Sequence, residues 1–255
     1  QQIHLALSDA YTFNPTTNNA MKVIFHTQEQ CMSAYISLKT PQGSIQKIAA
    51  TAVNYFHDTY SQFYMTYVHI FDLAELEFSQ TYEYSCYGTE TNDKFLTQAQ
   101  PQGPFKFHVP SPKYNNKETR VLMFADMDHS SEGMNTINAL TRLAQSDYQS
   151  ISAFLHVGDM SYNLYNQGGK RGDDFMNTVQ KFAAQVPYMV TAGNHETFGN
   201  FSNFNMRFQM PNFEHSQNHY YSFNLGNIHF VSFNLDFVLT NPNLKQNMLN
   251  WLDQD

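Results

Sequence analysis

The chain has 255 residues, 42% of them hydrophobic and 15% aromatic, which predicts one large or two ordinary domains with apolar cores. A formal net charge of −8 argues against a general binder of nucleic acids or anionic membranes. No stretch approaches the ~20 apolar residues of a membrane span. An anionic ligand would therefore need a local source of positive charge, such as a metal pair. The chain starts at Gln1 without a charged-then-apolar leader, which we interpret as a processed or truncated start.

Residues 1–110 have the pattern of an all-β domain. Short segments of alternating polar and apolar residues are separated by turn signals. The clearest strand candidates are residues 21–26, 34–38, 64–70 and 80–87. Roughly seven short strands in about 100 residues fit an immunoglobulin-like or fibronectin-III-like β sandwich.

Cys31 and Cys86 are the two cysteines of the chain, so it is not a disulfide-dense scaffold. Cys31 precedes one strand candidate and Cys86 ends another, so a sandwich would allow a bridge between them. The alternative is two separate, mostly buried thiols. The sequence leaves both arrangements open.

The pattern changes to α/β after a proline-rich segment, residues 101–117, which predicts a linker. The prolines of this segment are Pro101, Pro104, Pro110 and Pro112. Beyond it, three apolar runs typical of strands buried on both faces alternate with two helical patterns. The strand candidates are residues 121–125, 151–157 and 186–192, and the helical patterns cover 134–143 and 175–183. This order predicts a parallel sheet. A hairpin over 219–233 and a last helix over 244–252 follow.

Polar side chains follow each of the three predicted parallel strands. Asp126, Asp159 and Asn194 are spaced 33 and 35 residues apart, one strand–helix unit each time. Because the carboxyl ends of parallel strands share one edge of the sheet, we expect these side chains to converge. Hard cations prefer such oxygen ligands. Asp159 could bridge two metals, and Gly158 would allow the sharp turn before it.

Tyr162 and His195 complete the candidate set. The Tyr162 phenol can reach the same centre as Asp126, and a phenolate favours a trivalent ion such as Fe(III). Asn194 is a neutral donor that suits a divalent ion, whereas His195 could protonate a leaving alkoxide or hold a phosphate. Taken singly, these residues have structural alternatives, since Asp126 could cap a helix and Tyr162 could be a packed aromatic. The regular spacing favours the metal site.

Several motifs carry a resemblance to a known family. They are FLHVGDMSY at 154–162, RGDDFM at 171–176, PYMVTAGNHE at 187–196 and RFQMP at 207–211. With these motifs the chain resembles the purple acid phosphatases of the metallophosphoesterase superfamily. Residues 2–7 and 82–88 resemble the fibronectin-like N-terminal domain of that family.

The resemblance implies a fibronectin-III-like β sandwich over residues 1–110 and the N-terminal part of a calcineurin-like metallophosphoesterase domain over 118–255. It implies an acid phosphatase that hydrolyses phosphate monoesters with a metal-bound hydroxide at a dinuclear centre of Fe(III) and divalent Fe, Zn or Mn. Members of the family are secreted or lysosomal glycoproteins. The sequon that begins at Asn200 agrees with this.

The matching positions imply individual roles. Asp126 and Tyr162 would bind Fe(III), Asp159 would bridge the two metals, and Asn194 would bind the divalent ion. His195 would be the catalytic acid beside them.

Two departures from the family pattern stand out. Asp128 replaces the glycine of the family's Asp-x-Gly motif, and it would strain the backbone if that glycine is needed for a tight turn or a close approach. Asp128 also adds negative charge beside the metals. The three further histidine ligands of the family, in V-x-x-H and G-H-x-H motifs, have no match, because His215, His219 and His229 stand in other contexts.

These departures set expectations for the chain as given. We expect an N-terminal fragment without a stable two-metal site and with an exposed apolar sheet face. The alternative to the phosphatase is a truncated or degenerate, non-catalytic protein that acts through its sandwich domain.

Overall fold

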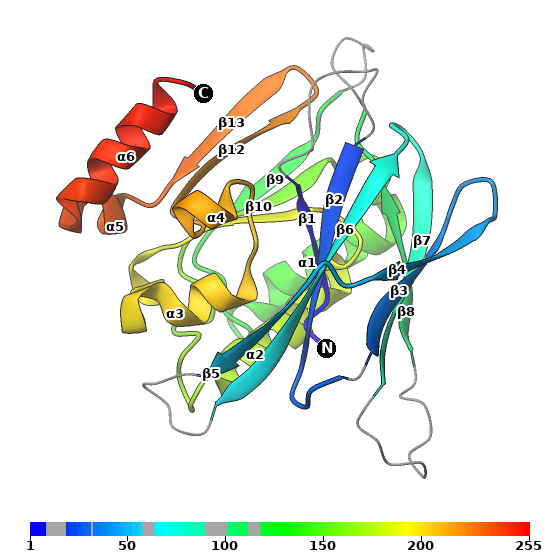
Figure 1. The fold of residues 1–255 in the computed structure, drawn as a ribbon, viewed down its shortest axis with the longest axis horizontal. Coiled ribbons are helices and arrows are strands. Elements are labelled where there is room, and N and C mark those ends of the chain that lie inside the picture. Colours follow the sequence, from blue (N-terminus) through cyan, green and yellow to red (C-terminus); the bar gives the residue numbers. More distant parts are fainter. Residues whose placement is uncertain (9–18, 32, 58–63, 90–100, 112–117) are drawn as a thin grey trace.

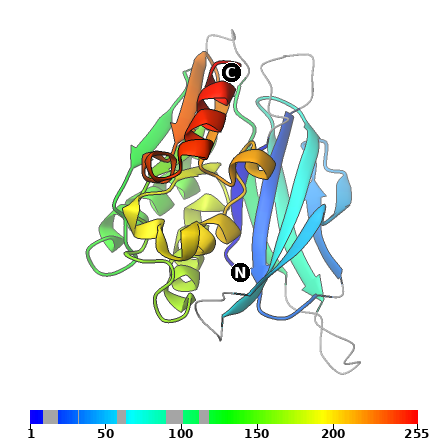
Figure 2. The same ribbon diagram turned by 60° about the vertical axis from the view of Figure 1, so that its left-hand side comes forward.

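The computed structural model describes residues 1–8, 19–31, 33–57, 64–89, 101–111 and 118–255. A sheet-rich N-terminal part and an α/β part lie side by side (Figures 1 and 2). No helix within the described ranges is long and apolar enough to cross a membrane.

Eight strands in the described part of residues 1–111 form two antiparallel sheets of four strands each. They are β1 (His4–Leu7), β2 (Asn19–Thr27), β3 (Ser33–Lys39), β4 (Ile45–Ala49), β5 (Ala52–His57), β6 (Met65–Leu76), β7 (Thr81–Thr89) and β8 (Gln102–His108). The strand orders are β1-β2-β6-β5 and β4-β3-β7-β8. Apolar side chains of both sheets, such as Phe71 and Tyr84, meet in one core. The prediction of an all-β region is confirmed, with eight strands instead of about seven.

The proline-rich segment is a linker over only part of its predicted length. Residues 102–108 form β8, which pairs with β7. Because β8 is the last strand of its sheet, Pro104 can lack a backbone N–H without leaving a ladder partner unsatisfied. The prediction of a linker from residue 101 onward was therefore wrong, and Pro112 lies outside the described residues.

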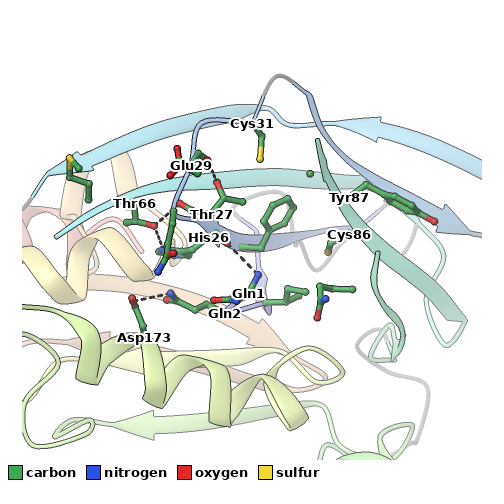
Figure 3. A pocket seen from close by; sticks show the side chains of 16 residues that line it. Gln1, Gln2, His26, Thr27, Glu29, Cys31, Thr66, Cys86, Tyr87 and Asp173 are labelled. Atoms are coloured by element: carbon green, nitrogen blue, oxygen red, sulfur yellow. Dashed lines mark hydrogen bonds between the residues drawn. The ribbon is translucent and has the colours of Figure 1, made fainter. Parts of the chain in front are cut away.

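No disulfide joins Cys31 and Cys86. Both line a cavity of about 250 Å³ that is also bordered by His26, Thr66 and the Asp173 side chain (Figure 3). Cys86 is buried, and this burial raises the pKa of its thiol to about 12. Of the two arrangements left open by the sequence, the structure has the separate thiols. The cavity contains none of the predicted metal ligands.

The α/β part begins with the predicted parallel sheet. Its elements are β9 (Val121–Phe124), α1 (Met134–Asp147), β10 (Ala153–Val157), α2 (Lys170–Ala183) and β11 (Tyr188–Thr191). The strand order is β11-β10-β9, and both pairings are parallel, as predicted. The apolar faces of the two helices, including Ile137 and Phe175, are buried in the core.

A hairpin and several short helices complete the chain. The elements are η1 (Asn194–Glu196), α3 (Phe198–Arg207), α4 (Phe213–Ser216), β12 (Tyr220–Leu225), β13 (Ile228–Phe233), α5 (Leu235–Thr240) and α6 (Pro242–Leu252). The predicted hairpin and last helix are confirmed.

Between β10, β11 and the hairpin lies an apolar groove of about 270 Å³. Met123, Val157 and Phe233 line it and are 65%, 45% and 43% exposed, so the expected exposed apolar face is present.

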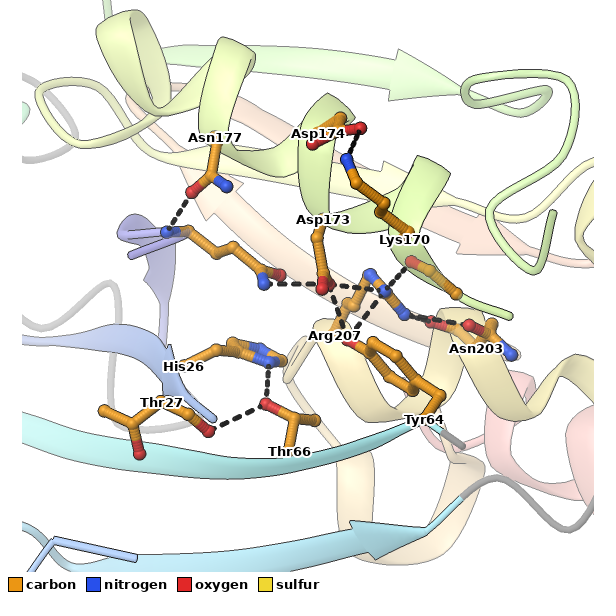
Figure 4. A network of polar contacts seen from close by, with 12 residues as sticks. His26, Thr27, Tyr64, Thr66, Lys170, Asp173, Asp174, Asn177, Asn203 and Arg207 are labelled. Carbon is orange, nitrogen blue, oxygen red and sulfur yellow. Dashed lines mark hydrogen bonds and ion pairs between the residues drawn. The ribbon is translucent and has the colours of Figure 1, made fainter. Parts of the chain in front are cut away.

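A buried ion pair within the α/β part, Arg207–Asp173, is contacted from the sheet-rich part by the Tyr64 hydroxyl (Figure 4). The Arg207 side chain is fully buried, and its Nη2 donates to Asp173 Oδ1 at 2.8 Å, to Tyr64 Oη at 2.9 Å and to the Gly169 carbonyl at 2.9 Å. The Tyr64 hydroxyl in turn donates to Asp173 at 2.5 Å. A Cβ at Gly172 would lie 2.7 Å from Arg207 Cζ, so this glycine leaves the space that Arg207 occupies. The two parts therefore meet at a buried charge that is paired with a carboxylate, although Arg207 Nε has no hydrogen-bond partner among the described residues.

Candidate metal centre at the ends of the parallel strands

The loops that follow β9 and β10 run together beyond the sheet. Asp126 N–H donates to the Gly158 carbonyl at 3.2 Å, and Ser161 N–H donates to the Met127 carbonyl at 3.1 Å. Met127 and Met160 form an isolated parallel bridge between these hydrogen bonds. The parallel pairing thus extends past the strands and carries Asp126 to the loop that holds Asp159.

Both loops contain residues with left-handed backbone. Asp126 and Asp159 both have φ of 54°, Ser161 has 63° and Tyr162 has 39°, beside Gly158 at 80°. Each non-glycine residue in this region costs on the order of 1–3 kcal/mol. Such strain persists only where surrounding contacts hold it, and it accumulates at functional sites.

Tyr162 and Asp126 come together as predicted from their spacing. The Tyr162 hydroxyl donates to Asp126 Oδ1 at 2.9 Å. Partial burial, this hydrogen bond and the negative charges of Asp126, Asp159 and Asp128 raise the pKa of the Tyr162 phenol to about 12. A bound cation would invert this effect, because it favours the phenolate.

The Asp159 carboxylate lies directly against Gly193, in space that any larger residue at position 193 would fill. A Cβ at Gly193 would lie 2.3 Å from Asp159 Oδ1. The Gly193 backbone is extended, with φ of −105°, so the glycine is needed for space and not for its conformation. Asp159 Oδ1 also accepts the His195 N–H at 3.2 Å, which ties the loop after β10 to η1.

Asn194 and His195 are the first two residues of η1, which follows β11. Asn194 is exposed at the start of this turn. His195 Nδ1 lies 2.7 Å from Asn163 Oδ1, and since an amide oxygen only accepts, Nδ1 carries the proton. The His195 ring packs edge-on against Tyr162, with 4.7 Å between centroids. His195 therefore lies on the side of the centre where Tyr162 and Asp126 meet.

Asp128 does not strain the backbone in the way that the sequence led us to expect. It is not among the described residues with left-handed backbone, so the expected strain is absent. Its carboxylate accepts from Arg171 Nη2 at 2.7 Å, and His129 Nδ1 lies 3.2 Å away. Arg171 Nε also donates to the Ser161 carbonyl at 2.5 Å. The added negative charge is thus paired with a guanidinium that braces the same loop.

Glu196 is a residue of the centre that sequence reasoning missed. The residue is 3% exposed, and its carboxylate accepts backbone N–H groups of Asp159, Met160 and Gly193 at 2.8–2.9 Å. Burial raises its pKa to about 7, against the lowering effect of these hydrogen bonds. A glutamate three residues after the start of a helical turn is a recognisable capping signal. That signal predicts the contact to Gly193 but not the other two.

The donor set fits a hard cation. No group of three or more His, Cys, Asp and Glu within the described ranges could hold a metal ion. The candidate ligands are instead two carboxylates, a phenol and an amide, and all four offer oxygen, which hard cations prefer. Tyr162 and Asp126 already lie within hydrogen-bond distance of each other, and Asp126 and Asn194 are open to solvent.

Comparison with known proteins shows to which protein family the chain belongs. Residues 119–254 match the family model of the calcineurin-like phosphoesterases. Because this match covers more than half of the chain, the protein belongs to the calcineurin-like phosphoesterase family.

Curated relatives carry the names of acid phosphatases, in agreement with the motifs of the sequence. Acid phosphatase type 7 of Homo sapiens is 36% identical over 140 residues, which are 53% of this chain and 30% of the relative. Its counterpart in Danio rerio is 32% identical over 69% of this chain and 36% of the relative. Purple acid phosphatase 22 of Arabidopsis thaliana is 26% identical over 100% of this chain and 52% of the relative. The resemblance to purple acid phosphatases is thereby confirmed. The chain spans about a third to a half of the length of these relatives.

A solved structure shares the fold. Purple acid phosphatase PPD1 from yellow lupin superposes with a TM-score of 0.70 over 91% of this chain and 44% of that chain, at 19% identity. This likeness includes the sheet-rich part as well as the α/β part, since it covers nearly the whole chain.

Proposed function

We propose that the protein is an acid phosphatase that hydrolyses phosphate monoesters at a dinuclear centre of Fe(III) and divalent Fe, Zn or Mn. The observation that carries this proposal is the hydrogen bond between Tyr162 and Asp126 at the ends of parallel strands, with the Asp159 charge close enough to act on the same phenol and all three residues on left-handed backbone. Relatives named acid phosphatases support it.

The proposal assigns each ligand a role. Asp126 and Tyr162 would hold Fe(III), Asp159 would bridge the two ions, and Asn194 would hold the divalent ion. When bound, the pair would neutralise phosphate charge and lower the pKa of the attacking water. The paired Asp128–Arg171 contact leaves Asp126 as the unpaired carboxylate nearest the phenol.

His195 would supply the proton that the leaving alkoxide needs. Asn163 Oδ1 holds the proton at Nδ1, so Nε2 is the atom that can carry the transferable proton. The backbone N–H of His195 is fixed by Asp159, so the ring moves with the ligand loop. Both contacts orient the imidazole before the substrate binds.

We also propose that the sheet-rich part is a fibronectin-III-like domain. The order β1-β2-β6-β5 corresponds to strands A, B, E and D of immunoglobulin-like sandwiches, and β4-β3-β7-β8 to C′, C, F and G. In the division of the chain that we propose, residues 1–110 form this domain and residues 118–255 belong to the catalytic domain.

A location in the secretory pathway, secreted or lysosomal, completes the proposal. Asn200 of the sequon is exposed in α3, where a glycan has room. Endoglycosidase treatment of the protein from a eukaryotic host should lower its mass, and Asn200→Gln should remove this shift. An unchanged mass of the wild-type protein would contradict the glycan.

Phosphatase activity is the test of the proposed function. The protein expressed from its own gene should hydrolyse p-nitrophenyl phosphate at acid pH, and Asp159→Asn should lower kcat at least a hundredfold, because the bridging position needs a carboxylate charge. Asp253→Asn, at an exposed aspartate in the last turn, is the matched control and should be as active as wild type. An Asp159→Asn variant with wild-type activity would contradict the proposal. A metal-loaded wild-type protein without activity would instead favour a non-catalytic role of the sheet-rich part.

A further inference from the structure

We propose that Glu196 is a positioning residue of the candidate metal centre. Its buried carboxylate clamps the loop after β10 to the end of β11 and thereby fixes the position of Asp159. The proposal rests on the proposed function for the nature of the ion, whereas the clamp itself rests on geometry alone.

The clamp consists of three hydrogen bonds to two oxygen atoms. Glu196 Oε2 accepts the N–H groups of Asp159 at 2.9 Å and Gly193 at 2.8 Å, and Oε1 accepts that of Met160 at 2.8 Å. A carboxylate has enough lone pairs for all three, and its charge strengthens each bond. One side chain thus holds two loops that are more than 30 residues apart in the sequence.

A carboxylate is required at this position. Buried N–H groups without partners cost about 1–3 kcal/mol each, and Glu196 accepts those of Asp159, Met160 and Gly193. Glutamine has the same length, but one of its two terminal atoms is an NH2 donor. Either orientation of that amide would direct a donor at one or two of the three backbone N–H groups.

The clamp acts on the ligand that would bridge the metals. Asp159 Oδ1 lies against Gly193 and accepts from His195 N–H, so its place depends on the distance between the two loops. Glu196 sets that distance through bonds to Asp159 and Gly193 themselves. If the clamp opens, the Asp159 carboxylate loses its fixed relation to Asp126 and Tyr162.

Helix capping alone does not account for Glu196. The bond to Gly193 N–H lies within the turn that Glu196 ends and is a capping contact. The bonds to Asp159 and Met160 cross to a different loop, 37 and 36 residues away in the sequence. These two bonds give the residue its role in the centre.

Glu196→Gln, studied in the protein expressed from its own gene, is the decisive variant. Amide hydrogen exchange measured by NMR reports on the clamp without any metal, and Mn²⁺ titration reports on the centre. Asp173→Asn is the matched control, because it alters another buried acidic network, at the interface with Arg207. Glu196→Gln should speed exchange at Asp159, Met160 and Gly193 at least tenfold and leave α2 amides unchanged.

The same variant should weaken Mn²⁺ binding about 10–100-fold, the usual effect of losing a residue that orients a ligand. Asp173→Asn should leave the Mn²⁺ affinity and the three amides unchanged. Wild-type exchange at these amides in Glu196→Gln would overturn the proposal, and so would faster exchange with an unchanged Mn²⁺ affinity. A wild-type chain that binds no Mn²⁺ would contradict the proposed function, while faster exchange at the three amides would still support the clamp.

Discussion

At the scale of single residues, Gly193 shows how a backbone position controls a candidate metal ligand, because it lies directly against the Asp159 carboxylate. Gly193→Ala would place a Cβ 2.3 Å from Asp159 Oδ1, so the carboxylate must move. We expect this variant to lose about 1–3 kcal/mol of unfolding free energy, the usual range for overpacking, and to bind Mn²⁺ more weakly. Urea unfolding and metal titration measure the two effects. Gly88→Ala, tight against Cys31 but remote from the centre, should affect stability alone. Unchanged Mn²⁺ affinity in Gly193→Ala would contradict the described site.

His156 makes the stability of the protein depend on pH. It is fully buried in β10 beside the Tyr188 hydroxyl, and burial lowers its pKa to about 3. The unfolded chain, with a histidine pKa near 6.5, therefore binds a proton below that pH when the folded chain does not, so stability falls as the pH falls from about 6.5 towards 3. Burial also lowers the pKa values of His4 and His219 to about 4, and these act in the same direction.

His156→Phe tests this dependence. Between pH 7.5 and pH 5 the loss of unfolding free energy should be smaller in the variant than in wild type by about 2 kcal/mol. Denaturant unfolding at the two pH values gives the comparison, whatever the absolute stability of the variant. An equal pH dependence in both proteins would show that His156 is not held neutral by the fold.

At the scale of elements, the first turn of α2 joins the centre to the interface. Arg171 holds Asp128 and the loop before Tyr162, and Asp173, two residues on, holds Arg207 and Tyr64. Arg207→Met should cost about 3–5 kcal/mol of stability, because it leaves a buried carboxylate without its charge partner. Arg142→Met, at an exposed position of α1, should change stability by less than about 0.5 kcal/mol.

The double variant Arg207→Met with Asp173→Leu sharpens this prediction. Removing both charges should cost less than the sum of the single variants, since no unpaired charge remains. Chemical unfolding of the four proteins gives the coupling free energy. A cost below about 1 kcal/mol for Arg207→Met would contradict a tight buried ion pair.

Elements with a regular period could be predicted from the sequence. The three parallel strands, α1, α2, the hairpin and α6 all have apolar residues at the spacing of their structure. The interior of α3 has no such signal, because Gly199, Asn200 and Phe201 have left-handed backbone there. β8 was not predicted, because the prolines around it indicated a linker, whereas a strand at the edge of a sheet tolerates a proline.

The candidate site could be predicted in part. The rule that ligands gather at the carboxyl ends of parallel strands is enough to place Asp126, Asp159 and Asn194 on the loops that follow β9, β10 and β11. The Arg171–Asp128 pair and the Glu196 clamp join residues 36–43 positions apart. Such contacts depend on how the loops pack, and no local pattern specifies them.

At the scale of the whole molecule, the charge and the fold point to the same centre. A chain with net charge −8 needs a local positive source to hold a phosphate, and Arg171 beside the centre is already paired with Asp128. The carboxylates around Tyr162 are thus placed to attract cations. The buried histidines lower the free energy of unfolding at acid pH. Activity at acid pH would therefore require a protein whose unfolding free energy at neutral pH exceeds this loss.

The visible absorption of the Fe(III)-loaded protein tests whether Tyr162 is an iron ligand. We predict a phenolate-to-Fe(III) charge-transfer band in wild type that is lost in Tyr162→Phe. Tyr165→Phe, three residues on in a ring stacked against Phe198, should keep the band. A band that persists in Tyr162→Phe, or a wild-type protein that binds Fe(III) without such a band, would contradict the assignment of Tyr162 and Asp126 to the metal centre.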